Sequence, residues 1–283
     1  MALMLGIIIY LNYFNPHFLY FTGNRGDLVS FIQYYCIYLF PYGIAFLLQL
    51  PFYKDKSFIH NRWFWIILFT APAIFSFRVN FSLHHILINR LSIENERLFW
   101  IHCSKWFSGL FTALIPVYCI WKIKDSKKIP FYGAGPLGSI KPYLLLVVCM
   151  IPLITLAATQ ADFLKMYPRA KVVDAWQLHP KWLYYTLHEL FYSLDFITIE
   201  FFFRGFLIIS LLGICGRQCI IPAAAFYCCI HLGKPIGEAI SSFAGGILLG
   251  IVSSNTRTIK GGLLVHLGIA WLMEIAGFVA AGS

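Results

Sequence analysis

Long apolar runs, separated by short polar stretches, make up most of this chain. Many of these runs are long enough, or nearly long enough, for a helix to cross the roughly 30 Å hydrocarbon core of a bilayer. The last run contains two apolar stretches separated by residues 255–260. The runs lie at residues 2–22, 28–53, 63–77, 106–121, 143–159, 183–213, 217–232 and 238–281. This pattern predicts an all-α fold, a polytopic transmembrane helical bundle of about eight spans.

Other stretches are too polar, or too rich in Gly and Pro, to cross a membrane. Residues 78–100 and 161–181 are expected to form loops or interfacial helices. Residues 124–142, rich in Lys, Gly and Pro, have the composition of a linker. We therefore predict two parts: transmembrane helices of unassigned role in residues 1–142, and a second part, residues 143–283, that carries every candidate site residue.

Composition supports a membrane location. Hydrophobic residues make up 59% of the chain and charged residues 12%, with a mean hydropathy of +0.73, whereas soluble domains carry roughly 25% charged residues. The lipid bilayer is therefore an expected partner. The net charge of +10 comes from Lys and Arg scattered between apolar runs, which fits the orienting of spans and predicts no nucleic-acid partner. The eight cysteines form no Cys-x-x-Cys pair and are expected to be reduced packing residues.

Candidate chemistry is concentrated in the most apolar third of the chain. Four polar residues lie there: Glu200, Arg204, His231 and His266. An ionisable side chain inside a membrane costs about 2.5 kcal/mol or more, so it usually faces the protein interior or a water-filled cavity. Glu200 and Arg204 are four residues apart, which places them on one helix face where they can pair. These residues are our candidate catalytic site.

A carboxylate beside two imidazoles can activate water for peptide-bond hydrolysis, with an imidazole or Arg stabilising the oxyanion. Structural roles remain open for each: an ion pair for Glu200 and Arg204, a helix-end position for His231, and an interhelical hydrogen bond for His266. We expect supporting roles for the remaining carboxylates of this part, Glu189, Asp195, Glu238 and Glu274.

No metal and no cofactor is expected. His188-Glu189 begins like a zincin helix, but Tyr192 stands where the second His ligand would be. No Cys cluster has zinc spacing, and the chain has neither a Gly-x-Ser-x-Gly elbow nor a phosphate-binding Gly-rich loop. Two His and one Glu could bind a metal in principle, which leaves that alternative open.

Three ordered motifs together resemble a known family. They are Glu200-Phe-Phe-Phe-Arg-Gly205, Tyr227 to His231 with the following Gly-Lys-Pro, and Gly261-Gly-Leu-Leu-Val-His266, with a Gly-rich helix after Glu238. This order is similar to that of the CAAX-protease and bacteriocin-processing family, also called CPBP or abortive-infection proteins, over roughly residues 183–281. The family consists of glutamate-dependent intramembrane proteases. The resemblance identifies residues 143–283 as a CPBP-like intramembrane protease core.

The resemblance implies roles for individual residues. In such a bundle a Glu and a His of the first two motifs, helped by the His of the third, activate water without an obligatory metal. Glu200, His231 and His266 match those positions, and Arg204 matches the structural partner. Two positions depart from the family pattern: Ile199 stands where a first glutamate is usual, and Ala270 where Asn or Asp is usual.

We therefore predict an intramembrane endopeptidase that hydrolyses a membrane-associated peptide or protein substrate through a Glu-activated water. Its expected location is the cytoplasmic membrane of a prokaryote. The alternative, favoured by Ile199 and Ala270, is a catalytically impaired family member acting as a membrane immunity or scaffold protein. A transporter with a Glu, His and Arg relay is a third interpretation, for which the sequence shows no inverted repeat.

Overall fold

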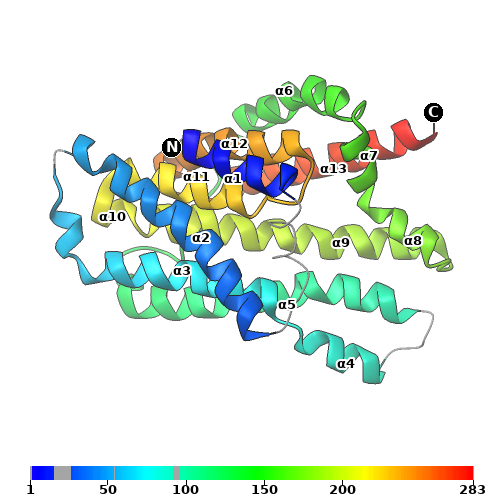
Figure 1. The fold of residues 1–283 in the computed structure, drawn as a ribbon, viewed down its shortest axis with the longest axis horizontal. Helices are drawn as coiled ribbons and strands as arrows, with labels where there is room; N and C mark the ends of the chain where they lie inside the picture. Colours follow the sequence, from blue (N-terminus) through cyan, green and yellow to red (C-terminus); the bar gives the residue numbers. More distant parts are fainter. Residues whose placement is uncertain (1, 16–26, 54, 92–95, 283) are drawn as a thin grey trace.

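The computed structural model describes residues 2–15, 27–53, 55–91 and 96–282, so the end of the expected run 2–22 lies outside the described residues. These residues form helices and no strands; an isolated bridge joins Ala134 and Thr258. The predicted all-α fold is confirmed (Figure 1). The α-helices are α1 (Ala2–Phe14), α2 (Leu28–Gln49), α3 (Arg62–Asn80), α4 (Leu83–Leu91), α5 (Arg97–Lys124), α6 (Lys141–Ala157), α7 (Ala161–Met166), α8 (Val172–Ala175), α9 (Lys181–Glu200), α10 (Leu212–Cys215), α11 (Ile220–Cys229), α12 (Ile236–Thr256) and α13 (Lys260–Gly282).

The apolar segments have the lengths that a polytopic bundle needs. Six segments of the described residues are long and apolar enough to span a membrane, and two shorter apolar helices, Leu3–Phe14 and Lys141–Ala157, accompany them. The long segments are Leu28–Phe52, Arg62–Arg90, Arg97–Lys124, Lys181–Cys229, Ile236–Thr256 and Lys260–Gly282. The prediction of about eight spans therefore corresponds to six long segments and two short helices. The polar stretch 78–100 holds α4, and the stretch 161–181 holds α7 and α8.

A polar cap begins α2, and a change from α-helix to π-helix follows α9. Asp27 accepts a hydrogen bond from the Ser30 backbone N–H (2.6 Å) and begins α2, satisfying one of the open donors of the first turn. Further along the chain, α9 continues beyond Glu200 as a π-helix, Phe201–Ile209. Such wide turns are rare and are frequent at functional sites. The first motif therefore lies at the junction of α-helix and π-helix.

An aromatic core joins the N-terminal helices to the motif-bearing helices. The ring of Phe226 in α11 lies 5.0 Å from Tyr38 of α2, 5.7 Å from Phe75 of α3 and 5.2 Å from Phe203 of the π-helix, measured between ring centroids. Aromatic pairs at these separations contribute beyond their buried area. The first two long segments thus pack directly on the helices that carry the candidate site.

Helix α12 lies close to α11, as its small residues predict. A Cβ added to Gly246 would lie 3.1 Å from the Ala224 Cβ, and one added to Gly250 would lie 2.9 Å from Ile220. Side chains at these positions would push the two helices apart. This close approach along Gly246 and Gly250 fixes α11 and the His231 turn that follows it.

Candidate active site

Glu200 and Arg204 form the predicted ion pair, and both side chains are buried. Arg204 Nη1 lies 3.4 Å from Glu200 Oε1, and the guanidinium carbon lies 4.4 Å from the centroid of the Tyr227 ring. A cation over an aromatic face is stabilised by the ring quadrupole. Beside the carboxylate, Gly262 has no side chain, and a Cβ there would overlap Glu200 Oε2. The Gly-Gly pair that begins α13 thus makes room for the acid.

His266 connects Glu200 to the second motif. Its Nδ1 lies 3.1 Å from Glu200 Oε1, and its Nε2 lies 2.9 Å from the Tyr227 hydroxyl. With the proton on Nδ1, His266 donates to Glu200 and accepts at Nε2 from Tyr227. A carboxylate that holds one ring nitrogen in this way fixes the tautomer and favours a proton on the other nitrogen.

His231 lies just beyond α11, in the turn before α12, and is buried. Its Nδ1 donates to the Tyr227 carbonyl oxygen (2.9 Å), and its Nε2 lies 3.9 Å from Glu238 Oε1. Burial, together with the neighbouring charge of Lys234, lowers the pKa of His231 to about 3. The imidazole is therefore neutral at neutral pH, with an unprotonated Nε2.

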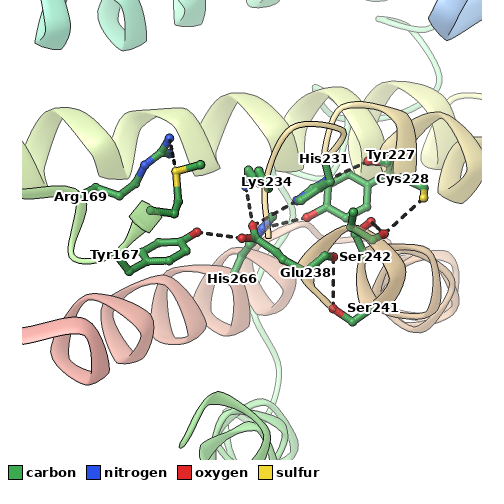
Figure 2. A network of polar contacts seen from close by, with 12 residues as sticks. Tyr167, Arg169, Tyr227, Cys228, His231, Lys234, Glu238, Ser241, Ser242 and His266 are labelled. Carbon is green, nitrogen blue, oxygen red and sulfur yellow. Dashed lines mark hydrogen bonds and ion pairs between the residues drawn. The ribbon is translucent and has the colours of Figure 1, made fainter. Parts of the chain in front are cut away.

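Glu238 ties this turn to the segment before α9. Lys234 Nζ donates to Glu238 Oε1 (2.6 Å), and the Tyr167 hydroxyl donates to Oε2 (3.0 Å). Figure 2 shows Glu238 between these two donors, with His231 and His266 beside it. The supporting role expected for Glu238 is thus one of holding the His231 turn in place.

A cavity of about 430 Å³ opens at these residues. Its wall includes Tyr227, His231 and His266, but Glu200 and Arg204 are absent from it. The structure therefore brings both imidazoles to one cavity and places Glu200 behind His266. Ile199, at the position where the family usually has its first glutamate, is itself part of the wall.

The other expected supporting carboxylates also have partners. Asp195 pairs with Arg78 of α3, and Glu189 Oε1 lies 3.1 Å from the His188 ring. Glu274 of α13 accepts the backbone N–H groups of residues 169 and 170, at 2.9 and 3.1 Å. Ala270 is buried in an apolar cluster around Trp106 and Tyr192. Asp195 and Glu274 therefore anchor separate elements around the cavity, whereas Glu189 contacts its neighbour in the same helix.

Sequence reasoning missed the hydroxyl of Tyr227. The pattern identified this position only as the aromatic residue four before His231. The presence of a tyrosine at this position could have indicated such a role, because a buried tyrosine hydroxyl usually finds a hydrogen-bond partner. Among the described residues, no group of three or more His, Cys, Asp or Glu side chains is arranged to hold a metal ion.

Comparison with known proteins finds a family match for the C-terminal helices. Residues 181–272 match a family described as type II CAAX prenyl endopeptidase Rce1-like. Over these residues the chain is similar to the Rce1-like CAAX proteases. The Rce1-like segment begins with α9 and extends into α13, and it includes all four candidate site residues. No curated protein and no solved structure gives a significant match. The long apolar helices, together with this similarity, make the chain an integral membrane protein.

Proposed function

We propose that this protein is an intramembrane endopeptidase that hydrolyses a membrane-associated peptide or protein substrate, in the cytoplasmic membrane of a prokaryote. The observation that supports it is the continuous path from Glu200 through His266 to the cavity wall. A buried acid that orients an imidazole facing a cavity is the arrangement of a general base. The Rce1-like match independently favours hydrolysis of a peptide bond.

In the proposed reaction a water in the cavity loses a proton to His266 Nε2 as its oxygen attacks the scissile carbonyl. The Glu200 carboxylate stabilises the resulting imidazolium, because it already accepts from Nδ1. Collapse of the tetrahedral intermediate breaks the C–N bond, and the imidazolium returns the proton to the departing amine. Glu200 is thus a positioning residue that acts on water through His266.

Tyr227 has a defined part in this proposal. Its hydroxyl donates to the one lone pair of His266 Nε2 in the resting site, so it must turn away before a water can donate its proton there. Once turned, the hydroxyl is available to donate to the oxyanion as negative charge develops. Ile199 offers no carboxylate at the cavity wall, so His266 and not an acid at position 199 would contact the water.

The test uses full-length protein in lipid nanodiscs and quenched fluorescent peptides, with and without an isoprenoid on a cysteine. Glu200→Gln and His266→Gln should each lower kcat about 100-fold or more with KM little changed. Asp55→Asn, which alters an exposed carboxylate in a loop, is the matched control and should turn over peptide normally. Cleavage at the wild-type rate by both site variants would refute the proposal.

The impaired-relative alternative makes a different prediction. If wild-type protein cleaves none of the peptides, and if Glu200→Ala and His266→Ala both preserve the phenotype of the host gene, the protein acts as a membrane immunity or scaffold protein. Ile199 on the cavity wall is the observation behind this second candidate.

A further inference from the structure

The cavity wall carries an excess of positive charge. Its cationic side chains are Arg78, Lys105, Arg169 and Lys234, and its only carboxylate among the described residues is Asp195. Two of these cations have acidic partners: Arg78 pairs with Asp195, and Lys234 pairs with Glu238. The ammonium of Lys105 lies 4.6 Å from the centroid of the Trp106 ring. The remaining cation, Arg169, is in a different situation.

Among the described residues, Arg169 is in direct contact with no carboxylate. Its guanidinium carbon lies 5.3 Å from the centroid of the Tyr192 ring, and one nitrogen lies 3.8 Å from the Met166 sulfur. In the part of the chain that the structure describes, no carboxylate oxygen lies within 4.0 Å of its side-chain nitrogens. The nearby Glu274 accepts the backbone N–H of Arg169 instead. The Tyr192 hydroxyl also hydrogen-bonds to the guanidinium, and the charge of Glu238 acts on it from further away. The positive charge of Arg169 therefore faces the cavity with no carboxylate in direct contact among the described residues.

The backbone around Arg169 is held firmly in place. Glu274 of α13 bonds to two successive N–H groups, those of Arg169 and Ala170, and Tyr167 bonds to Glu238 of α12. Figure 2 shows Arg169 on the same segment as Tyr167, across from His231 and His266. A pre-positioned guanidinium loses little freedom when it binds an anion. This segment precedes the Rce1-like match, which begins at residue 181.

We propose that Arg169 binds a carboxylate of the peptide substrate and so selects substrates with a negative charge near the scissile bond. The proposal rests on the peptidase function proposed above, since it places the anion in the cavity of His231 and His266. A guanidinium binds a carboxylate through two parallel hydrogen bonds, and such charge-assisted bonds are strong where water is excluded. A cavity of about 430 Å³ has room for several residues of an extended peptide.

The carboxylate could come from the chain terminus or from an Asp or Glu side chain. Three fluorescein-labelled apolar heptapeptides separate these sources: one with a free C-terminus, its C-terminal amide, and the amide with one Glu. Binding to full-length His266→Gln protein in phosphatidylcholine nanodiscs is measured by fluorescence anisotropy, so that no turnover is required. A peptide that binds tightly only with the free terminus identifies that source, and tight binding of the Glu amide identifies the side chain.

At least one carboxylate peptide should bind about tenfold or more tightly than the neutral amide. Adding Arg169→Gln to the His266→Gln protein should remove this difference in affinity. The affinity for the neutral amide should stay unchanged. Arg169→Lys should keep part of the difference, because a lysine supplies charge without the bidentate geometry. Lys165→Gln, which removes an exposed cation from α7, is the matched control. This variant should keep the whole difference in affinity between charged and neutral peptides.

Other outcomes would overturn the inference. Equal affinity for charged and neutral peptides, including no binding of either, would show that Arg169 selects no carboxylate. Equal losses for both peptides in Arg169→Gln would show a structural role only. Loss of peptide discrimination in nanodiscs rich in phosphatidylglycerol, with the arginine intact, would assign the residue to lipid phosphate. Charge-dependent binding without hydrolysis by wild-type protein would uphold this inference and defeat the peptidase proposal.

Discussion

The hydroxyl of Tyr227 is the single atom whose removal tests the proposed chemistry most directly. Tyr227→Phe keeps the ring over Arg204 and deletes the bond to His266 Nε2. If the hydroxyl stabilises the oxyanion, kcat should fall about 100-fold, as for other single oxyanion donors, with a small change in KM. Steady-state cleavage of the quenched peptides measures both constants.

A second tyrosine supplies the control for that substitution. Tyr42 is fully buried, its hydroxyl has no hydrogen-bond partner among the described residues, and it does not line the cavity. Tyr42→Phe should leave kcat unchanged and leave stability equal or slightly higher, because it removes an unsatisfied buried group. An equal loss of activity in both variants would contradict the role given to the Tyr227 hydroxyl.

His231 predicts a pH dependence of stability. Its pKa is about 3 in the folded protein and about 6.5 in an unfolded chain. Between these values only the unfolded state binds the proton, so stability falls as the pH drops below about 6.5. From pH 7 to pH 5, wild-type protein should lose about 2 kcal/mol more than His231→Gln. Unfolding by SDS in mixed micelles at each pH measures the difference, and parallel losses would show that His231 accepts a proton when folded.

Among the helices, the start of α13 must remain free of side chains for Glu200 to occupy its position. A methyl group at residue 262 would overlap Glu200 Oε2, so Gly262→Ala should displace the carboxylate from His266 and lower kcat. Gly245→Ala in α12 is the matched control, since a Cβ there meets nothing within 4 Å. It should keep full activity and gain up to about 1 kcal/mol from helix propensity. Equal activity of the two variants would mean that Glu200 tolerates displacement.

Helix α13 also anchors the segment that carries Arg169. Both oxygens of Glu274 accept backbone N–H groups, so Glu274→Ala leaves two buried donors open and Glu274→Gln leaves one. Each open donor costs about 1–3 kcal/mol, and the loss of stability should therefore be larger for the Ala variant. Unfolding in mixed micelles gives the order, and a larger loss for Gln would contradict this anchoring.

At the scale of the whole molecule, hydropathy was sufficient to predict the helical bundle, because in lipid an isolated segment satisfies its backbone only as a helix. The i, i+4 spacing likewise predicted the pair of Glu200 and Arg204. The sequence could not reveal that Glu200 lies behind His266 and off the cavity wall. That position depends on the π-helix after Glu200 and on Gly262, which are features of tertiary packing. The division at residue 142 stays a prediction.

The position of the short helix α6 decides how much of the molecule lies in lipid. At 17 residues it is shorter than the long spans, yet most of its exposed side chains are apolar, including Leu145, Val148 and Leu153. Such a face is stable in hydrocarbon and costly in water. We therefore expect α6 to lie within the bilayer, where Cys149 is shielded from water.

Cysteine accessibility in intact proteoliposomes tests this expectation. Cys36, Cys119 and Cys149 are exposed on the helices, and the other five cysteines are buried. A charged, membrane-impermeant thiol reagent should leave all eight unmodified, because lipid covers the exposed three and thiolates are disfavoured there. Lys128→Cys, at an exposed position in the polar connection after α5, should react readily in vesicles that present this side outward, and SDS should make every cysteine reactive. Modification of Cys149 alone would place α6 in water and leave the long spans in the membrane, since Cys36 and Cys119 report on α2 and α5 separately.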